Sequence, residues 1–291
     1  MPVQVIAEVL TVRRVGAYVA MTVVAPGVAE QTRPGHFVAI QVGGPEGATI
    51  LRRAFAICDV KQRGVYGGTV EFVFAVHGKG TAWLAARRPQ DKLDMVGPLG
   101  KPFRLPTHAV TATLVGGGYG SAPLLPLATA LRERGSRVDF VLGAATSDRL
   151  FGQLEAKRMA SSIAVTTDDG SAGERGRVSD VLSALLDRTG SEVVYACGPM
   201  AMLHAVSDIA LAHDIPSQVA VEESMACGIG VCMTCVLPVI GDDGQTRMVR
   251  SCVDGPVFLG DRVRWTEAGT VPDDAVGAPT PAASATLAGR R

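Results

Sequence analysis

Four cysteines near the C-terminal end of the chain constrain its fold more than any other feature. They follow the pattern C-x4-C-x2-C with a fourth, more distant cysteine: Cys227, Cys232, Cys235 and Cys252. This is the ligand spacing of plant-type [2Fe–2S] clusters, in which a tight loop aims three thiolates at one small inorganic core. Gly228 and Gly230 let the backbone of this loop pass close to the sulfides. We therefore predict that the four thiolates bind a [2Fe–2S] cluster and that the chain carries electrons.

Zinc and disulfide bonds are the alternatives for these cysteines. Structural zinc usually takes its ligands as short pairs such as C-x2-C, and the four-residue gap before Cys232 fits that pattern poorly. Disulfides need an oxidising compartment, whereas the first residues have neither the basic nor the apolar region of a secretory signal. We expect a cytoplasmic protein. Cys58 and Cys197 lie far from this pattern in the sequence. A cysteine outside a ligand pattern is more often a small buried apolar side chain than a metal ligand.

Length and charge narrow the class of protein. The 291 residues are enough for two or three domains. The chain has 28 basic and 28 acidic residues and no basic run interleaved with aromatic residues, so we expect no nucleic-acid partner. One uncharged stretch, between Arg104 and Arg132, imitates a membrane span. Glycines and prolines interrupt it, so a buried strand that runs into a helix is the better interpretation, and no membrane partner is expected.

Residues 1–104 show the pattern of an antiparallel β-barrel or sandwich. Short runs of β-branched and aromatic residues at 3–7, 18–24, 36–42 and 70–76 alternate with glycine-rich turn signals. Arg53 stands where one such strand begins, and a guanidinium at this position can bind a phosphate bidentately. The alternative is that Arg52 and Arg53 are both exposed to solvent and bind no ligand. Residues 78–84 indicate a glycine loop that feeds a helix N-terminus, which offers free N–H groups to an anion.

Residues 105–218 show the pattern of a doubly wound α/β domain. An apolar strand at 109–115 leads into the turn Gly116-Gly117-Gly118 and then into a helix, and two more strands follow at 138–142 and 193–195. The ligand of such a parallel sheet lies at the carboxyl ends of its strands. The strict G-x-G-x-x-G spacing is absent, and a tight turn without a ligand is the alternative. Cys197 and Gly198 end the last of these strands, where they could face a nicotinamide ring, and a core cysteine is the alternative.

The order of these parts resembles the ferredoxin–NADP reductase superfamily. The C-terminal cysteine module narrows the resemblance to the electron-transfer subunits of NAD-linked dihydroorotate dehydrogenase B, enzymes of pyrimidine biosynthesis. The likeness covers roughly residues 3–265 and includes the segments 78–81, 97–100, 116–118, 167–171, 197–199 and 222–235. It implies a multidomain β plus α/β fold, with an FAD-binding barrel, an NAD-binding sheet and a [2Fe–2S] module at residues 219–268.

The resemblance also implies site residues. It assigns to FAD the residues Arg53, Ala54, Phe55, Ala56, Phe72, Val73, Phe74, Gly80 and Thr81. To NAD(H) we assign Gly116, Gly117, Gly118, Gly198 and Pro199, with Cys197 as the catalytic residue beside the nicotinamide. The shared segment 167–171, Thr-Asp-Asp-Gly-Ser, has no role that the sequence reveals beyond a polar loop. Family members commonly carry a hydroxyl residue at the position of Ala56. Because one neutral hydrogen bond contributes little free energy, we expect the missing hydroxyl to change the reactivity of the flavin more than the binding of the flavin.

The function implied by the resemblance is electron transfer between two subunits. NAD(H) exchanges hydride with FAD, FAD exchanges single electrons with the cluster, and an FMN-containing dihydroorotate dehydrogenase catalytic subunit is the partner. The alternatives are a reductase subunit of another redox complex and a non-catalytic binding module with a degenerate flavin site. NADH is favoured over NADPH, because residues 143–149 offer one arginine beside an aspartate. Residues 269–291, rich in Ala, Pro, Thr and Gly, are predicted to form a disordered tail.

Overall fold

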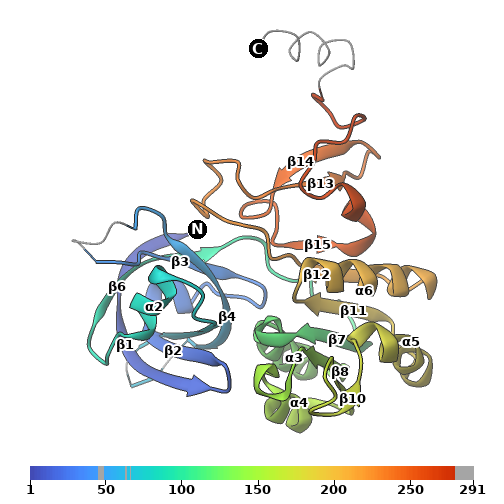
Figure 1. Ribbon diagram of the computed structural model, residues 1–291, viewed down its shortest axis with the longest axis horizontal. Helices are drawn as coiled ribbons and strands as arrows, with labels where there is room; N and C mark the ends of the chain where they lie inside the picture. The colour runs from blue at the N-terminus through green and yellow to red at the C-terminus, as the bar shows by residue number, and fades with distance from the viewer. Residues whose placement is uncertain (45–48, 63, 66, 279–291) are drawn as a thin grey trace.

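The computed structural model describes residues 1–44, 49–62, 64–65 and 67–278. A β-barrel and an α/β unit lie side by side, and a small C-terminal module sits over the junction between them (Figure 1). This arrangement confirms the predicted fold class. Among the described residues, every helix is too short or too polar to cross a lipid bilayer.

The barrel is closed by six antiparallel strands in the order β1-β2-β5-β4-β3-β6. They are β1 (Val3–Val15), β2 (Tyr18–Val24), β3 (Phe37–Ile40), β4 (Arg53–Lys61), β5 (Thr69–Phe74) and β6 (Lys92–Leu99). Their inward residues form one apolar core, in which the rings of Phe55 and Phe72 stack with centroids 5.2 Å apart. Two short helices, α1 (Pro26–Ala29) and α2 (Lys79–Ala85), lie between strands. Closure removes the exposed strand edges that would otherwise invite pairing with other chains.

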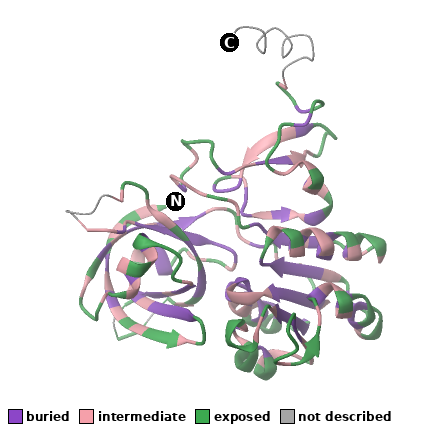
Figure 2. Cartoon of the chain, in the orientation of Figure 1, coloured by how far each residue is buried: buried purple, intermediate pink, exposed green. Residues whose placement is uncertain are grey.

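The α/β unit is a seven-stranded sheet in the order β10-β9-β8-β7-β11-β12-β15. Its strands are β7 (Thr111–Gly117), β8 (Arg137–Ala144), β9 (Ser162–Thr167), β10 (Glu174–Arg175), β11 (Val193–Cys197), β12 (Ser217–Ala220) and β15 (Val257–Leu259). All pair in parallel except β15, which adds to β12 in the antiparallel sense. The central strands are buried on both faces, as Figure 2 shows, which explains their nearly continuous apolar sequences.

Helices cover both faces of this sheet. The helices α3 (Leu124–Glu133) and α4 (Gln153–Met159) pack on one face, and α5 (Val178–Thr189) and α6 (Met200–Ala212) pack on the other. The 3-10 turns η1 (Gly118–Ser121) and η2 (Ser147–Arg149) follow β7 and β8. The loops after β7, β8, β9 and β11 therefore gather at the carboxyl edge of the sheet, where such folds bind ligands.

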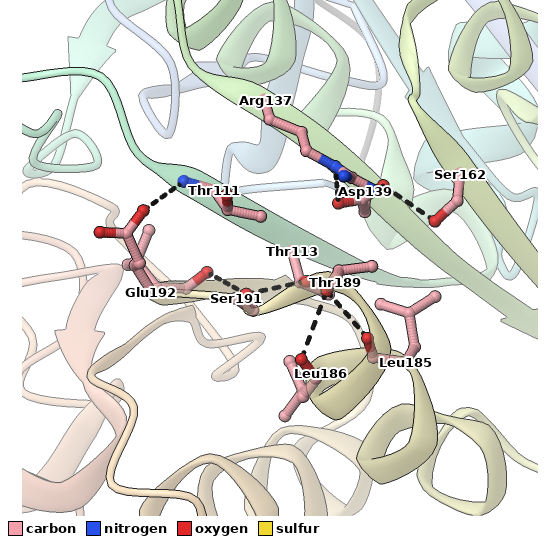
Figure 3. Close-up of polar contacts among 11 residues, drawn as sticks. Thr111, Thr113, Arg137, Asp139, Ser162, Leu185, Leu186, Thr189, Ser191 and Glu192 are labelled. Carbon is pink, nitrogen blue, oxygen red and sulfur yellow. Dashed lines mark hydrogen bonds and ion pairs between the residues drawn. The ribbon is translucent and has the colours of Figure 1, made fainter.

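Polar side chains at the amino ends of the strands form a network with a structural role (Figure 3). The fully buried Asp139 carboxylate accepts hydrogen bonds from Arg137 (3.0 Å) and from the Ser162 hydroxyl (2.8 Å). The Ser191 hydroxyl donates to Thr113 (2.9 Å) on the neighbouring strand. These bonds satisfy the buried polar groups at the edge of the sheet that lies opposite the ligand loops.

The C-terminal module is joined to both other parts. It contains the hairpin β13 (Val236–Ile240) and β14 (Thr246–Arg250) and the turns η3 (Gly260–Arg262) and η4 (Trp265–Glu267). Although β15 follows this hairpin in sequence, it belongs to the α/β sheet. Against the barrel, Cys235 and Cys252 pack in one apolar cluster with Phe37, Ala39 and Leu99. The module is therefore held between sheet and barrel.

The segment predicted to be a disordered tail begins with packed residues. Ala275 is buried, and the Val276 N–H donates a hydrogen bond to the Thr246 carbonyl (2.9 Å) on β14. The Asp274 carboxylate also accepts a hydrogen bond from Arg264 (2.6 Å). The packed chain thus extends beyond the predicted boundary at residue 268 to residue 278, and residues 279–291 lie outside the described part of the chain.

A buried histidine makes the stability of the barrel depend on pH. His36 precedes β3, its Nδ1 accepts the Arg33 N–H (3.0 Å), and burial lowers its pKa to about 4. The unfolded chain binds this proton near pH 6.5, so stability is lost as the pH falls from 6.5 towards 4, by about 3 kcal/mol in full. We expect His36→Asn, which cannot take up the proton, to lose less stability than the wild type between pH 7.5 and 5 in urea denaturation. Equal losses in both proteins would contradict this assignment.

Candidate functional site

Two cavities open where the barrel, the sheet and the C-terminal module meet. The sheet cavity, of about 470 Å³, lies at the carboxyl ends of β7, β8 and β9 and includes Gly117, Gly118, Thr166 and Pro199. The barrel cavity, of about 370 Å³, lies between β4 and β5 on one side and the loop after β12 on the other. Tyr119 and Glu222 line both cavities. The two spaces are therefore neighbours separated by a wall that these two side chains share.

The barrel cavity gathers most of the residues that the resemblance assigned to FAD. Its lining includes Arg53, Ala54, Phe55, Ala56, Val73, Phe74 and Thr81. Phe72 is fully buried in the barrel core, where it packs against Phe55 instead of facing the cavity. Gly80 lies behind Arg53, because a Cβ at Gly80 would stand 3.3 Å from the Arg53 Nε. Seven of the nine assigned residues thus line the cavity, and Gly80 shapes it by leaving room for the guanidinium.

Arg53 is placed to bind an anion, whereas Arg52 is not. The Arg52 guanidinium forms a bidentate pair with Asp94 (2.7 Å and 3.1 Å), and this hydrogen bonding lowers the pKa of Asp94. Arg53 donates to the carbonyl of Leu51 (2.8 Å), and no carboxylate among the described residues pairs with it. A guanidinium that faces a cavity without a carboxylate partner is suited to a phosphate. The residues therefore fit the pyrophosphate of a flavin dinucleotide.

The sheet cavity contains part of the predicted dinucleotide site. Gly117, Gly118 and Pro199 line it. Gly116 and Gly198 do not: a Cβ at Gly116 would lie 2.6 Å from the Ser121 Cβ, and one at Gly198 would lie 3.1 Å from the Gly117 backbone. These two glycines allow the turn after β7 and the turn after β11 to pack closely. The half-buried turn at Gly117 and Gly118 leaves space for a pyrophosphate.

The wall between the cavities combines an aromatic ring with a carboxyl group. Tyr119 belongs to η1, its ring packs edge-on against Tyr18 of the barrel (centroids 5.3 Å apart), and burial raises its pKa to about 12. Glu222 follows β12, and its side chain is exposed to water through the cavities. The protein around its carboxyl group raises the pKa of that group. A ligand in either cavity would reduce the exposure of this side chain.

Cys197 lies in the barrel cavity, not in the sheet cavity where the sequence placed the nicotinamide. Its side chain is 5% exposed, and burial, with a smaller effect of Glu222, raises the pKa of its thiol. The thiol is therefore protonated at neutral pH, which makes it a poor nucleophile. A role for Cys197 in positioning a ring near Glu222 fits this environment better than a covalent role.

The loop formed by residues 225–235, the cluster loop, has the features of an iron–sulfur cradle. The N–H groups of Ile229 and Val231 donate to the Cys227 sulfur (3.5 Å and 3.3 Å), and the Cys252 N–H donates to the Cys235 sulfur (3.4 Å). Such N–H donors stabilise thiolates. The neighbouring Ser251 hydroxyl is fully buried and has no partner among the described residues.

The thiols are arranged in two pairs. Cys232 lies next to Cys227, and Cys252 lies next to Cys235. Within the described residues, no three His, Cys, Asp or Glu side chains gather around one point as they would for a single metal ion. A structural zinc needs four ligands around one ion, whereas a [2Fe–2S] core has two irons, each of which takes two thiolates. The paired arrangement therefore fits the cluster better than zinc.

Apolar side chains surround the exposed face of the cluster loop. Ile229, Val231, Met233 and Val253 are 52%, 76%, 51% and 37% exposed, and together we call them the apolar rim. Cys232 is exposed between them. Met225, in contrast, is partly buried against the apolar cluster of Phe37 and Leu99. Apolar side chains exposed beside a ligand loop are typical of an interaction surface.

Sequence reasoning missed several residues of the two cavities. Tyr18 carries no signal, because it is one aromatic residue in an ordinary barrel strand. Tyr119 and Glu222 occur beside recognised segments, but no local pattern shows that they meet. Thr166 and Asp168 line the sheet cavity and lie at or beside the segment 167–171, which the sequence singled out without a role. These residues come together only through the folding of distant segments.

Comparisons with known proteins identify the family of each region. Residues 222–264 match the iron-sulfur cluster binding domain of dihydroorotate dehydrogenase B, and residues 114–208 match the oxidoreductase NAD-binding domain. Among similar proteins, the dihydroorotate dehydrogenase B (NAD(+)) electron transfer subunit of Desulforamulus reducens is 34% identical and covers 83% of this chain and 90% of its own length. The corresponding subunit of Bacillus caldolyticus is 39% identical over 79% of this chain and 86% of its own length.

Solved structures show the same fold. The structure of an NADH-dependent reduced ferredoxin-NADP oxidoreductase has a TM-score of 0.78 and 32% identity, with 91% of both chains covered. A ferredoxin NADP+ reductase from Neisseria gonorrhoeae with bound FAD and NADP has a TM-score of 0.59 at 16% identity, over 72% of this chain and 91% of its own. The second likeness supports the fold alone.

The environment of Arg53 yields a prediction about flavin affinity. Arg53→Ala removes a charge-assisted contact to phosphate. We expect the binding free energy of FAD to fall by about 1.5–3 kcal/mol, which weakens the affinity on the order of ten- to a hundredfold. Titration of the flavin-depleted protein with FAD measures this change. Arg52→Ala is the matched control, because its guanidinium already pairs with Asp94. An equal loss in both variants would place the phosphate elsewhere.

The cluster loop yields a prediction about colour and iron content. Cys232→Ser removes one thiolate, so the protein purified without air is expected to lose the visible absorption of the cluster and most of its iron. Its bound flavin is expected to remain, since Cys232 does not line the barrel cavity. Cys58→Ser is the control, because Cys58 is buried in the barrel far from the loop in sequence. An iron content unchanged in Cys232→Ser would remove this residue from the ligand set.

Proposed function

The chain belongs to the family of dihydroorotate dehydrogenase B electron transfer subunits, and on this premise we propose that it transfers electrons between an FMN-containing dihydroorotate dehydrogenase subunit and NAD+. Oxidation of dihydroorotate in the partner releases two electrons and two protons, and a cluster held by this chain would supply one-electron transfer. Both electrons and one proton convert NAD+ to NADH, and the second proton is released to water. The proposal requires sites for a cluster, FAD and NAD(H) in that order.

The single observation that carries the proposal is the order of the three sites in space. The cluster loop packs through Met225 against Phe37, and both residues also line the barrel cavity. The barrel cavity in turn shares Tyr119 and Glu222 with the sheet cavity. One layer of side chains therefore separates each site from the next. Electrons can cross such short gaps through packed protein without movement of whole domains.

The residues that line the two cavities have different roles in this mechanism. Bound FAD exchanges a hydride with nicotinamide and single electrons with an iron–sulfur cluster. Arg53 and the N–H groups near Thr81 would hold the flavin pyrophosphate, and the turn at Gly117 and Gly118 would hold that of NAD(H). Glu222, whose pKa is raised by the surrounding protein, lies in the wall between the two cavities and is placed to give or take a proton there.

The partner binds at the apolar rim. An electron that reaches the cluster must enter or leave through a protein surface, and Cys232 is exposed there between Ile229, Val231 and Met233. Burial of these side chains under a partner removes apolar surface from water and excludes water from the electron path.

All six cysteines are free thiols, and a reducing cytoplasm keeps them available as ligands.

A second redox complex is the alternative. The structural likeness to the NADH-dependent reduced ferredoxin-NADP oxidoreductase, at 32% identity over 91% of both chains, favours a ferredoxin-linked reductase subunit. Both candidates use the same three sites, and they differ in the protein that docks at the apolar rim. The identity of that partner is therefore the property to test.

Co-expression with an FMN-containing dihydroorotate dehydrogenase subunit tests the proposal. The two chains are expected to co-purify, and addition of dihydroorotate and NAD+ is expected to produce NADH only when both are present. The control is a catalytic subunit that reduces an artificial acceptor, together with a cluster in this chain that NADH still reduces. If no NADH forms under these conditions, the ferredoxin-linked alternative is favoured. A chain that binds no flavin would instead be a non-catalytic binding module.

The apolar rim yields a prediction for a single charge. Val231→Glu places a carboxylate on the most exposed apolar residue of the rim, 76% exposed, and burial of an unpaired charge opposes docking. We expect the complex to weaken by roughly tenfold or more, since one poorly placed charge at an interface costs at least 1–2 kcal/mol. Reduction of the flavin by NADH is expected to be unchanged. The control is Leu211→Glu, an exposed apolar residue on α6. A complex of normal affinity would place the partner on another surface.

A further inference from the structure

Arg250 at the end of β14 is fixed beside one of the two thiol pairs. Its carbonyl accepts hydrogen bonds from the N–H groups of Val253 (3.0 Å) and Asp254 (2.8 Å), and the turn closed by these bonds contains Cys252. The Asp254 carboxylate in turn accepts the Arg250 N–H (3.1 Å). The backbone of Arg250 is therefore held in place next to the pair of Cys235 and Cys252.

The side chain of Arg250 reaches the other thiol pair through one peptide group. Its Nη1 donates a hydrogen bond to the Gly230 carbonyl (2.9 Å). The N–H of the same peptide group belongs to Val231 and donates to the Cys227 sulfur (3.3 Å). A trans peptide group is planar, and its C=O and N–H point in opposite directions. A guanidinium that holds the carbonyl therefore turns the N–H towards the sulfur.

Glycine is required at residue 230 for this orientation of the peptide. The φ angle of Gly230 is +87°, in the left-handed region that favours glycine. A Cβ on Gly230 would stand 2.5 Å from the Val253 Cγ2, in the turn that the Arg250 carbonyl holds. The cluster loop and this turn therefore approach each other too closely for a side chain at residue 230. The Arg250 side chain is 38% exposed at this contact, so water screens its charge only in part.

The hydrogen bond from Arg250 also affects the electrostatics at the Cys227 sulfur. A donor on the carbonyl polarises the peptide group and makes its N–H a stronger donor, because hydrogen bonds in a chain strengthen one another. Hydrogen bonds to the sulfurs and the local net charge set the reduction potential of an iron–sulfur cluster. One-electron reduction adds a negative charge among the thiolates, and both the guanidinium and the polarised N–H stabilise that charge.

We propose that Arg250 is a positioning residue that raises the reduction potential of the [2Fe–2S] cluster through the peptide group between Gly230 and Val231. The inference rests on the proposed function, because it takes Cys227 as a ligand of the cluster. A raised potential favours transfer of an electron to the cluster site from a donor docked at the apolar rim. The residue thereby adjusts the first electron transfer from the partner, although it lies outside the lining of both cavities.

A redox titration of the purified full-length chain tests the inference without a partner and without an activity assay. Electron paramagnetic resonance of the reduced cluster reports the reduction potential, and iron analysis reports the cluster content. Arg250→Gln removes the charge and shortens the side chain. Its cluster is expected to be roughly tenfold harder to reduce, which is a fall of about 59 mV for a one-electron couple. Arg250→Lys keeps a positively charged donor and is expected to recover more than half of this fall.

Arg247→Gln is the matched control, because Arg247 lies on the same strand and pairs with Asp243 (2.6 Å) near the turn of the hairpin. Its potential is expected to equal that of the wild type. A wild-type potential in Arg250→Gln, or an equal fall in both variants, would overturn the role of Arg250. Loss of iron from Arg250→Gln would also overturn it, since the residue would then serve the assembly of the site alone. If the wild type itself binds no cluster, the proposed function fails together with the inference.

Discussion

The packing of the cluster loop against the barrel is the contact on which the rest of the structure depends. Phe37 on β3 lines the barrel cavity and also lies in one apolar cluster with Cys235 and Cys252. The pairing of β15 with β12 makes this contact possible, because it returns the chain to the sheet after the β13–β14 hairpin. The segment that contains the cluster loop is thereby anchored to the sheet at both ends, by β12 before it and by β15 after it. Close packing then fixes the distance between the cluster site and the flavin site.

A second set of contacts fixes the sheet against the barrel. The Tyr18 hydroxyl on β2 donates to the Arg149 carbonyl (2.8 Å), and the Ala17 N–H donates to the Asp148 carbonyl (2.9 Å). The Tyr18 ring also supports Tyr119 in the wall between the cavities. The barrel therefore positions the nucleotide side of the wall as well as the flavin side. Such fixed orientation is the main contribution that a protein makes to hydride transfer between two cofactors.

The sequence could predict what short segments encode and could not predict where distant segments meet. The ligand spacing of Cys227, Cys232 and Cys235 is local, because one tight loop must hold three thiolates, and the strand patterns are equally local. The difference between Arg52 and Arg53 was not accessible, since it depends on Asp94 on another strand. The position of Cys197 in the barrel cavity and the shared wall of Tyr119 and Glu222 likewise depend on how β7, β11 and β12 end beside one another.

The two walls of the barrel cavity divide binding from reactivity. On the barrel side, Arg53 and Thr81 supply the charge and polarity that a pyrophosphate needs, and Ala56 adds only a methyl group to the same wall. On the opposite side, Cys197, Glu222 and Ser224 bring polar atoms from the sheet and the C-terminal module. The hydroxyl missing at Ala56 would contribute about 0.5–1.5 kcal/mol, which is small beside a charge-assisted contact to phosphate. Under the proposed function, the barrel would thus retain the flavin, while the polar groups nearest to its reactive ring would come from the opposite side of the cavity.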